Sequence, residues 1–165
     1  MTPRQAGLAL ALAHTALVAS LGAKLLADRA RLPHGWARTL PFDPDLPIRG
    51  RYVRLRLEIP LDSAPADVGQ WDLRSVRLRV ENDRLVGTLD TVSPTMARFD
   101  SVNGEVRGSL AAPVAFFIPE HIPDPSVRAA GEELWAEVTV TRRGPPRPIR
   151  LAIRRDGALT PLEIR

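Results

Sequence analysis

The hydrophobic positions of this 165-residue chain follow two different patterns. From Ala6 to Ala23 the chain is apolar around the whole circumference of a helix, and only His14, Thr15 and Ser20 interrupt it. From residue 48 onwards, apolar and charged residues instead alternate one by one in short runs. A continuous apolar run predicts a membrane-spanning helix, whereas period-two alternation predicts strands with one buried face.

The N-terminal run has the length of a helix that crosses a bilayer, because about 18–21 residues at about 1.5 Å each span roughly 27–32 Å. We predict a short basic tail at 1–5 and a transmembrane helix or signal anchor at 6–27. Lys24 and Arg31 follow the apolar residues, where they can reach lipid head groups. A cleaved, secreted form stays open, because Val18-Ala19-Ser20 or Ser20-Leu21-Gly22 offers the small residues of a cleavage site.

Prolines separate this helix from the alternating segments. The stretch LPFDPDLPI at 40–48 contains three prolines, which exclude a helix and favour an extended connector. We therefore predict a juxtamembrane Pro-rich connector at 28–47, with Trp36 at the membrane interface, and a β-rich domain at 48–165.

Short strands are expected throughout the β-rich domain. Val53, Leu55, Leu57 and Ile59 alternate with charged residues, and similar short runs occur at 76–81, 85–92, 99–102, 105–110, 114–118, 134–140, 151–153 and 159–164. Asn103-Gly104 and Asp156-Gly157 are tight-turn dipeptides, and Asp124 before Pro125 predicts one short helix within 123–133. The pattern predicts an all-β domain, an antiparallel barrel or sandwich of about eight or nine short strands, after one N-terminal transmembrane helix.

The net charge of +4 belongs to the N-terminal quarter of the chain. Residues 1–40 contain five basic residues and one acidic residue, while residues 41–165 contain 18 of each sign. Arg54, Arg56, Arg77 and Arg79 would share an outer sheet face with the acidic Glu58 and Glu81, so we expect ion pairs there. A neutral body with few aromatic residues argues against nucleic-acid binding.

Three segments of the chain resemble a known family. Gly50-Arg51-Tyr52-Val53-Arg54-Leu55-Arg56-Leu57-Glu58-Ile59 resembles the signature GDYxxLxxxV, which names bacterial membrane-anchored proteins without an assigned activity. Arg51 replaces the family's acid, and Ile59 replaces its valine. Phe116-Phe117-Ile118-Pro119-Glu120 is similar to the family's (Y/F)FxPE segment, and residues 42–49 are similar to its proline-aspartate lead-in.

The resemblance implies an anchored β domain that faces the cell envelope, without a catalytic residue. It gives a structural or binding role to the family-motif residues Gly50, Tyr52, Leu55, Ile59, Phe117, Pro119 and Glu120. Family members are often encoded beside polytopic membrane proteins, which implies a partner of that kind.

The orientation of the chain in the membrane stays open. We expect a single-pass protein of the bacterial inner membrane with its β domain in the periplasm. However, one basic residue precedes the apolar run and four follow it before residue 40, and the positive-inside rule then favours a cytoplasmic β domain.

Candidate chemistry is sparse. The only lysine is Lys24, so a Ser/Lys dyad in the β domain is excluded, and no GxSxG segment surrounds a serine. A speculative polar cluster consists of Asp43, Asp45, His121 and Asp124, which would serve an envelope hydrolase as the alternative function. The chain has no cysteine, and we expect no enzyme activity, cofactor, metal or small-molecule ligand.

Overall fold

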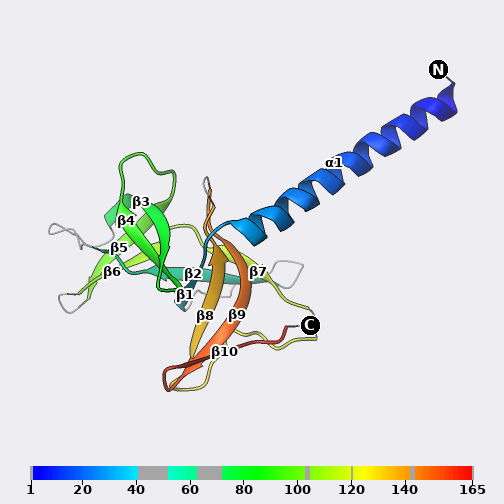
Figure 1. The fold of residues 1–165 in the computed structure, drawn as a ribbon. Coiled ribbons are helices and arrows are strands. Elements are labelled where there is room, and N and C mark those ends of the chain that lie inside the picture. The colour runs from blue at the N-terminus through cyan, green and yellow to red at the C-terminus, as the bar shows by residue number, and fades with distance from the viewer. Residues whose placement is uncertain are drawn as a thin grey trace. The chain divides into compact units, whose positions relative to one another are not determined.

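The computed structural model describes residues 2–40, 52–62, 72–102, 105–119, 121–141 and 144–164. The chain divides into two compact units, Met1–Leu32 and Pro33–Arg165. The first unit is helical and the second is built from strands, so each is described by itself (Figure 1).

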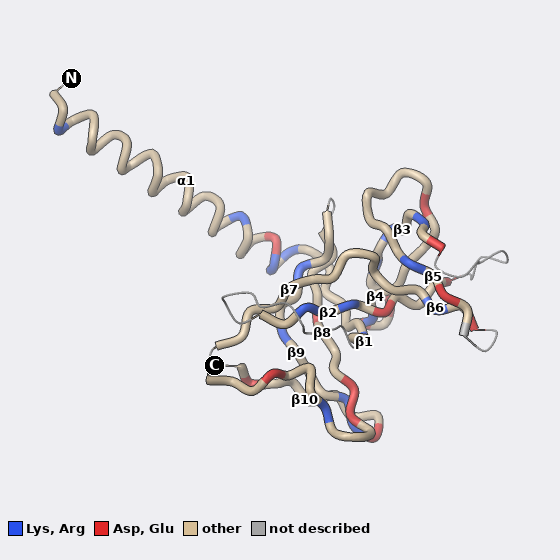
Figure 2. Tube along the Cα trace, turned by 180° about the vertical axis from the view of Figure 1, so that it is seen from behind, with Lys and Arg blue, Asp and Glu red and all other residues tan. Residues whose placement is uncertain are grey.

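The N-terminal unit is the helix α1, Pro3–Arg31. It begins at a capping box, in which Thr2 and Gln5 exchange side-chain to backbone hydrogen bonds, with Pro3 in the first turn. It is long and apolar enough to cross a membrane, as a signal sequence also is, and none of its residues is buried. In Figure 2 the tube is tan from the blue segment at Arg4 to the blue segment at Lys24.

The three polar side chains inside the apolar run of α1 bond to the helix itself. Thr15 Oγ1 donates to the carbonyl oxygen of Ala11 at 2.9 Å, and Ser20 Oγ donates to that of Leu17 at 2.8 Å. His14 Nδ1 lies 3.0 Å from the carbonyl oxygen of Leu10. Each polar group therefore has a partner within the same helix, which a helix surrounded by hydrocarbon requires.

The described residues of the second unit form ten strands. They are β1 (His34–Leu40), β2 (Tyr52–Ile59), β3 (Asp72–Glu81), β4 (Arg84–Leu89), β5 (Met96–Val102), β6 (Glu105–Leu110), β7 (Val114–Phe117), β8 (Glu133–Thr139), β9 (Arg147–Arg155) and β10 (Ala158–Pro161). The predicted all-β class is confirmed, and the architecture is a barrel with additional strands.

Six strands close the barrel in the order β1-β4-β3-β5-β6-β2, and β2 pairs again with β1. The closing contacts are short: Trp36 pairs in parallel with Arg84, and Thr39 and Leu40 pair with Leu57 and Arg56. β8, β9 and β10 extend the sheet outwards from β1, and β7 flanks β2 (Figure 1). β1 therefore belongs both to the barrel and to the outer extension.

Alternation along the strands builds the core. In β2 every second side chain is buried, from Val53 to Ile59, as the sequence predicted. Two hairpins turn on residues with positive φ. Asp156 and Gly157, the dipeptide expected from the sequence, have φ of 50° and 84°, and Asn82 and Asp83 have φ of 48° and 60°. Positive φ at both central positions is the geometry of type I′ turns.

Gly108 in β6 is the position where the barrel tolerates no side chain. It pairs with Phe99 of β5 on one side and Ile59 of β2 on the other. A Cβ at this position would lie 2.8 Å from the carbonyl oxygen of Ile59 and 2.8 Å from Cε1 of Phe99. The phenyl ring of Phe99 therefore packs directly over Gly108. Phe99 is the largest fully buried side chain of the core.

Two expectations differ from the structure. The range 28–47 was predicted as a connector, but α1 continues to Arg31 and β1 begins at His34, and residues 41–47 lie outside the described residues. The expected short helix in 123–133 is replaced by turns and bends up to residue 132, where Asp124 Oδ1 accepts a bond from Ser126 N at 2.8 Å. This side-chain bond closes a local turn instead of capping a helix. The dipeptide Asn103-Gly104 lies outside the described residues.

Asp90, which follows β4, makes the chain's stability sensitive to acid. Its carboxylate accepts a bond from Val92 N at 3.0 Å and pairs with the Arg77 guanidinium at 2.7 Å, and these bonds lower the pKa of Asp90 below 3.8. A lowered pKa in the folded state stabilises the fold above the ordinary carboxyl pKa, and this contribution is lost as the pH falls through the lowered value. Asp90→Asn should therefore lower the unfolding free energy more at pH 7 than at an acidic pH below the lowered pKa of Asp90, and urea unfolding across this pH range measures the difference.

Candidate functional site

The two segments that resemble family motifs lie side by side in the structure. β7 is antiparallel to β2, and the register places Tyr52 opposite Phe117 and Leu55 opposite Val114. Tyr52 and Phe117 are 65 positions apart in the sequence, so only the fold brings them together. β7 is the last strand of the sheet order at this end, within the described residues.

The motif residues divide between the core and an outer face. Leu55 and Ile59 are fully buried in the barrel, which gives them a structural role. Tyr52 and Phe117 lie on the opposite face, with ring centroids 6.0 Å apart and ring planes inclined by 58°. Phe117 is 76% exposed, and the Arg54 guanidinium carbon lies 6.0 Å from the centre of the Tyr52 ring. We call Tyr52, Arg54 and Phe117 the aromatic edge.

The remaining predicted site residues do not form a site in the part of the chain that is described. Gly50, Asp43, Asp45 and Glu120 lie outside the described residues, as does Arg51. Pro119 is half-buried directly after β7. His121 and Asp124 belong to the turns before β8, and no group of three His, Asp or Glu side chains gathers there or elsewhere in the described ranges.

The expected arginine face is neutralised by ion pairs. Arg77 pairs with Asp90 at 2.7 Å, and Arg79 pairs with Glu81 at 2.9 Å and also with Asp62. Figure 2 shows blue and red segments interspersed over β3, β4 and the neighbouring strands. The sequence prediction of ion pairs on this face is confirmed for Arg77 and Arg79, while Arg54 lies against an aromatic ring instead.

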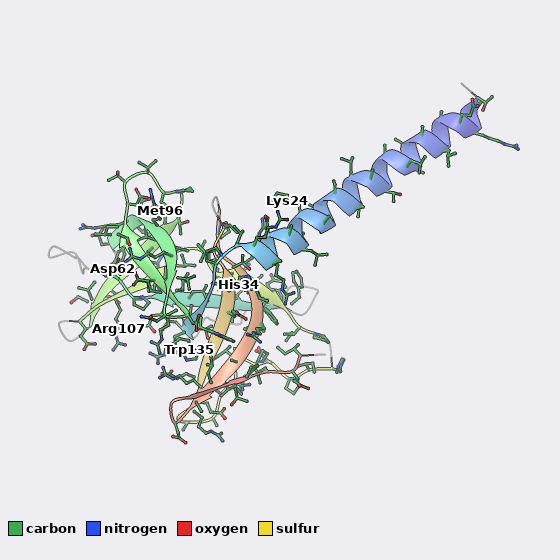
Figure 3. All side chains as sticks on the ribbon, in the orientation of Figure 1. Lys24, His34, Asp62, Met96, Arg107 and Trp135 are labelled. Carbon is green, nitrogen blue, oxygen red and sulfur yellow. The ribbon has the colours of Figure 1, made fainter. Side chains whose placement is uncertain are left out.

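A second surface, centred on Trp135 of β8, was missed by sequence analysis. Trp135 alternates with the inward residues of its strand, which predicts an outward indole, yet its exposed fraction is only 6%. The guanidinium carbons of Arg84 and Arg154 lie 5.0 and 5.3 Å from the Trp135 ring and cover it. Figure 3 labels Trp135 on β8, near the end of the β3–β4 hairpin that carries Arg84.

The Trp135 ring lines a concave surface together with Trp36 of β1. Two hollows of about 290 and 270 Å³ are both lined by Trp36, Arg84, Trp135 and Arg154, and we call these four residues the tryptophan groove. Trp36, which we placed at the membrane interface, lies in β1 with the Arg150 guanidinium carbon 5.3 Å from its ring centre. The sequence shows the two tryptophans but not the arginines that cover them, because these arginines are distant from Trp36 and Trp135 along the chain.

Comparisons with protein-family models, with curated proteins and with solved structures return no match for this chain. The candidate surfaces therefore rest on the geometry of the chain's own residues.

Proposed function

We propose that this chain is a single-pass protein of the bacterial inner membrane whose β domain lies in the periplasm and serves as an accessory module of a polytopic membrane protein. It acts by binding and not by catalysis. The apolar helix α1 is the anchor, and the β unit supplies the contact surface.

The properties of α1 support the anchoring part of the proposal. Its apolar run buries no residue in the protein, and the polar side chains inside the run have partners within the helix. Burial of such a run in hydrocarbon is favourable, because no backbone or side-chain polar group of the run loses its partner. Arg29 and Arg31 in the last turn favour a position at the head groups.

The aromatic edge is the observation that carries the binding part of the proposal. Phe117 exposes most of its ring beside Tyr52, on the last strand of the sheet order at this end. Aromatic side chains are enriched in protein interfaces, and a sheet edge can add a strand from a partner through backbone hydrogen bonds. These residues also belong to the segments that resemble the GDYxxLxxxV family, whose members are encoded beside polytopic membrane proteins.

Crosslinking in native membranes tests the proposal. The tagged full chain should recover a polytopic membrane protein in about equal amount, identified by mass spectrometry. Phe117→Ala should reduce this recovery about tenfold, because exposed aromatic anchors carry more than 1 kcal/mol of binding energy. Val127→Ala is the matched control, since Val127 is 73% exposed in a turn outside the aromatic edge and should leave recovery unchanged.

Two results would contradict the proposal. Recovery of no polytopic protein would contradict the proposed partner. Equal recovery with Phe117→Ala and Val127→Ala would show that the aromatic edge is not the contact surface. The orientation is read separately from alkaline phosphatase fused after Arg165, which is active only when exported. Activity only from a cytoplasmic reporter fused at the same position would place the β domain in the cytoplasm.

A further inference from the structure

We propose that the tryptophan groove binds an acidic peptide segment, with its carboxylates paired to Arg84 and Arg154. The source of the segment rests on the proposed function, since an acidic loop of the polytopic partner is the ligand expected there. The groove is a separate surface from the aromatic edge, with no residue in common.

Arg84 and Arg154 differ from most arginines of the β unit in their partners. Neither has a carboxylate within ion-pairing distance among the described residues, and the guanidinium group of each lies over the Trp135 ring. The exposed Arg77, Arg107 and Arg155, by contrast, each pair with a carboxylate. Two guanidinium groups that converge on one ring therefore keep their hydrogen-bond donors available for an incoming anion.

The indole between the two arginines is held in place by a chain of contacts. Trp135 Nε1 donates to Glu133 Oε2 at 3.1 Å, and Glu133 Oε1 pairs with Arg38 Nε at 3.2 Å. Arg38 also pairs with Glu58 at 3.5 Å. A fixed ring beneath both guanidinium groups limits their rotamers before any ligand arrives, and this lowers the entropy that binding must overcome.

The shape of the groove favours a chain segment over a single ion. The hollows of about 290 and 270 Å³ adjoin a third of about 470 Å³, which Arg154 also lines. The third hollow continues to the β9–β10 turn at residues 156–157. A few peptide residues fill such a continuous depression, and two carboxylates along them can meet the two arginines.

The acidic side chains of the groove leave the two arginines available. Glu133 is engaged by Arg38 and Trp135, and Glu132 pairs with Arg155. Asp83 and Asp156 belong to the two hairpin turns, and neither forms an ion pair with Arg84 or Arg154 in the described structure. The two guanidinium groups, which have no carboxylate partner in the described part of the chain, therefore lie together over the Trp135 ring.

Fluorescence anisotropy with a labelled Glu-Asp-Glu-Asp-Glu peptide tests the proposal. The full chain is held in nanodiscs of phosphatidylcholine, so that no anionic lipid competes. The wild-type chain should bind this peptide and not a Gln-Asn-Gln-Asn-Gln peptide, and higher NaCl should weaken binding. The double variant Arg84→Gln/Arg154→Gln should weaken binding at least about tenfold, because two charge-assisted pairs are lost.

Two further double variants serve as controls for Arg84→Gln/Arg154→Gln. Arg77→Gln/Arg107→Gln removes the same charge from two ion-paired arginines, neither of which lines the hollows of the tryptophan groove. It should bind like the wild type. Arg84→Lys/Arg154→Lys keeps the charge and should bind between the wild type and the glutamine variant. Four results would overturn the proposal. Two concern the wild type, which would fail to bind the acidic peptide or would bind the neutral peptide equally well. In the other two, both glutamine variants would weaken binding equally, or millimolar phosphate would displace the peptide.

Peptide binding and partner capture can fail independently. Peptide binding without any polytopic protein in the crosslinking experiment would refute the proposed function and leave the groove assignment standing. Loss of peptide binding in Arg84→Gln/Arg154→Gln together with wild-type capture of that protein would refute the partner's acidic loop as the ligand of the groove and leave the proposed function standing.

Discussion

Leu17→Arg should release the chain from the membrane fraction. Leu17 lies near the middle of the apolar run and is fully available to lipid, since α1 buries no residue in the protein. An arginine near the centre of a spanning helix raises the apparent insertion free energy by about 3–4 kcal/mol relative to leucine. Extraction of membranes with alkaline carbonate should leave the wild-type chain in the pellet and the variant in the supernatant.

The control for this experiment is Leu17→Phe, which keeps the apolar character and should remain in the pellet. Intact mass of the purified wild-type chain separates the anchor from a cleaved signal peptide. A mature chain that begins after Ser20 or Gly22 would show that the helix is removed, and the anchoring proposal would then be wrong.

Phe99→Ala should destabilise the β unit more than any exposed substitution. The Phe99 side chain is fully buried and packs over Gly108, so its removal leaves a cavity that the neighbouring glycine cannot fill. Loss of a buried phenyl ring costs about 3–5 kcal/mol of unfolding free energy. Urea unfolding of the full chain in mild detergent, followed by far-ultraviolet circular dichroism, measures this loss.

The same chemical change at an exposed position provides the comparison. Phe117→Ala removes an identical ring that is 76% exposed, so the unfolding free energy should change by less than about 1 kcal/mol. A similar loss for both variants would mean that Phe99 is not a core residue, and that the barrel interior is placed incorrectly.

Most strands of the barrel could be predicted from alternation, but the strand that closes it could not. β2 alternates between large apolar and charged residues, so its buried face is visible in the sequence. In β1 the buried positions are Gly35 and Ala37, which carry almost no hydrophobic signal. β1 pairs with β2, β4 and β8, and the pairing with β2 closes the barrel. Because the sequence did not predict β1 as a strand, it could not distinguish a barrel from a sandwich.

The candidate surfaces depended on information that one sequence does not contain. The two motif segments were recognisable, but their pairing follows from the register of β2 with β7, which no local pattern specifies. Trp135 was expected on the outer face, and the arginines that cover it come from β4 and β9. The covering of an outward ring by distant cations is a tertiary effect, so alternation could not predict it.

The position of β1 also sets an order for the folding of the domain. Only Leu32 and Pro33 separate α1 from β1, so β1 is made directly after α1 and well before β8. Its longest ladder is with β8, where His34 pairs with Thr139 and Arg38 pairs with Trp135. Contacts between positions so far apart in sequence form slowly, because a long loop must close first. The edge of β1 that receives β8 must wait until β8 has been synthesised, so the domain completes its fold long after α1 and β1 have been made.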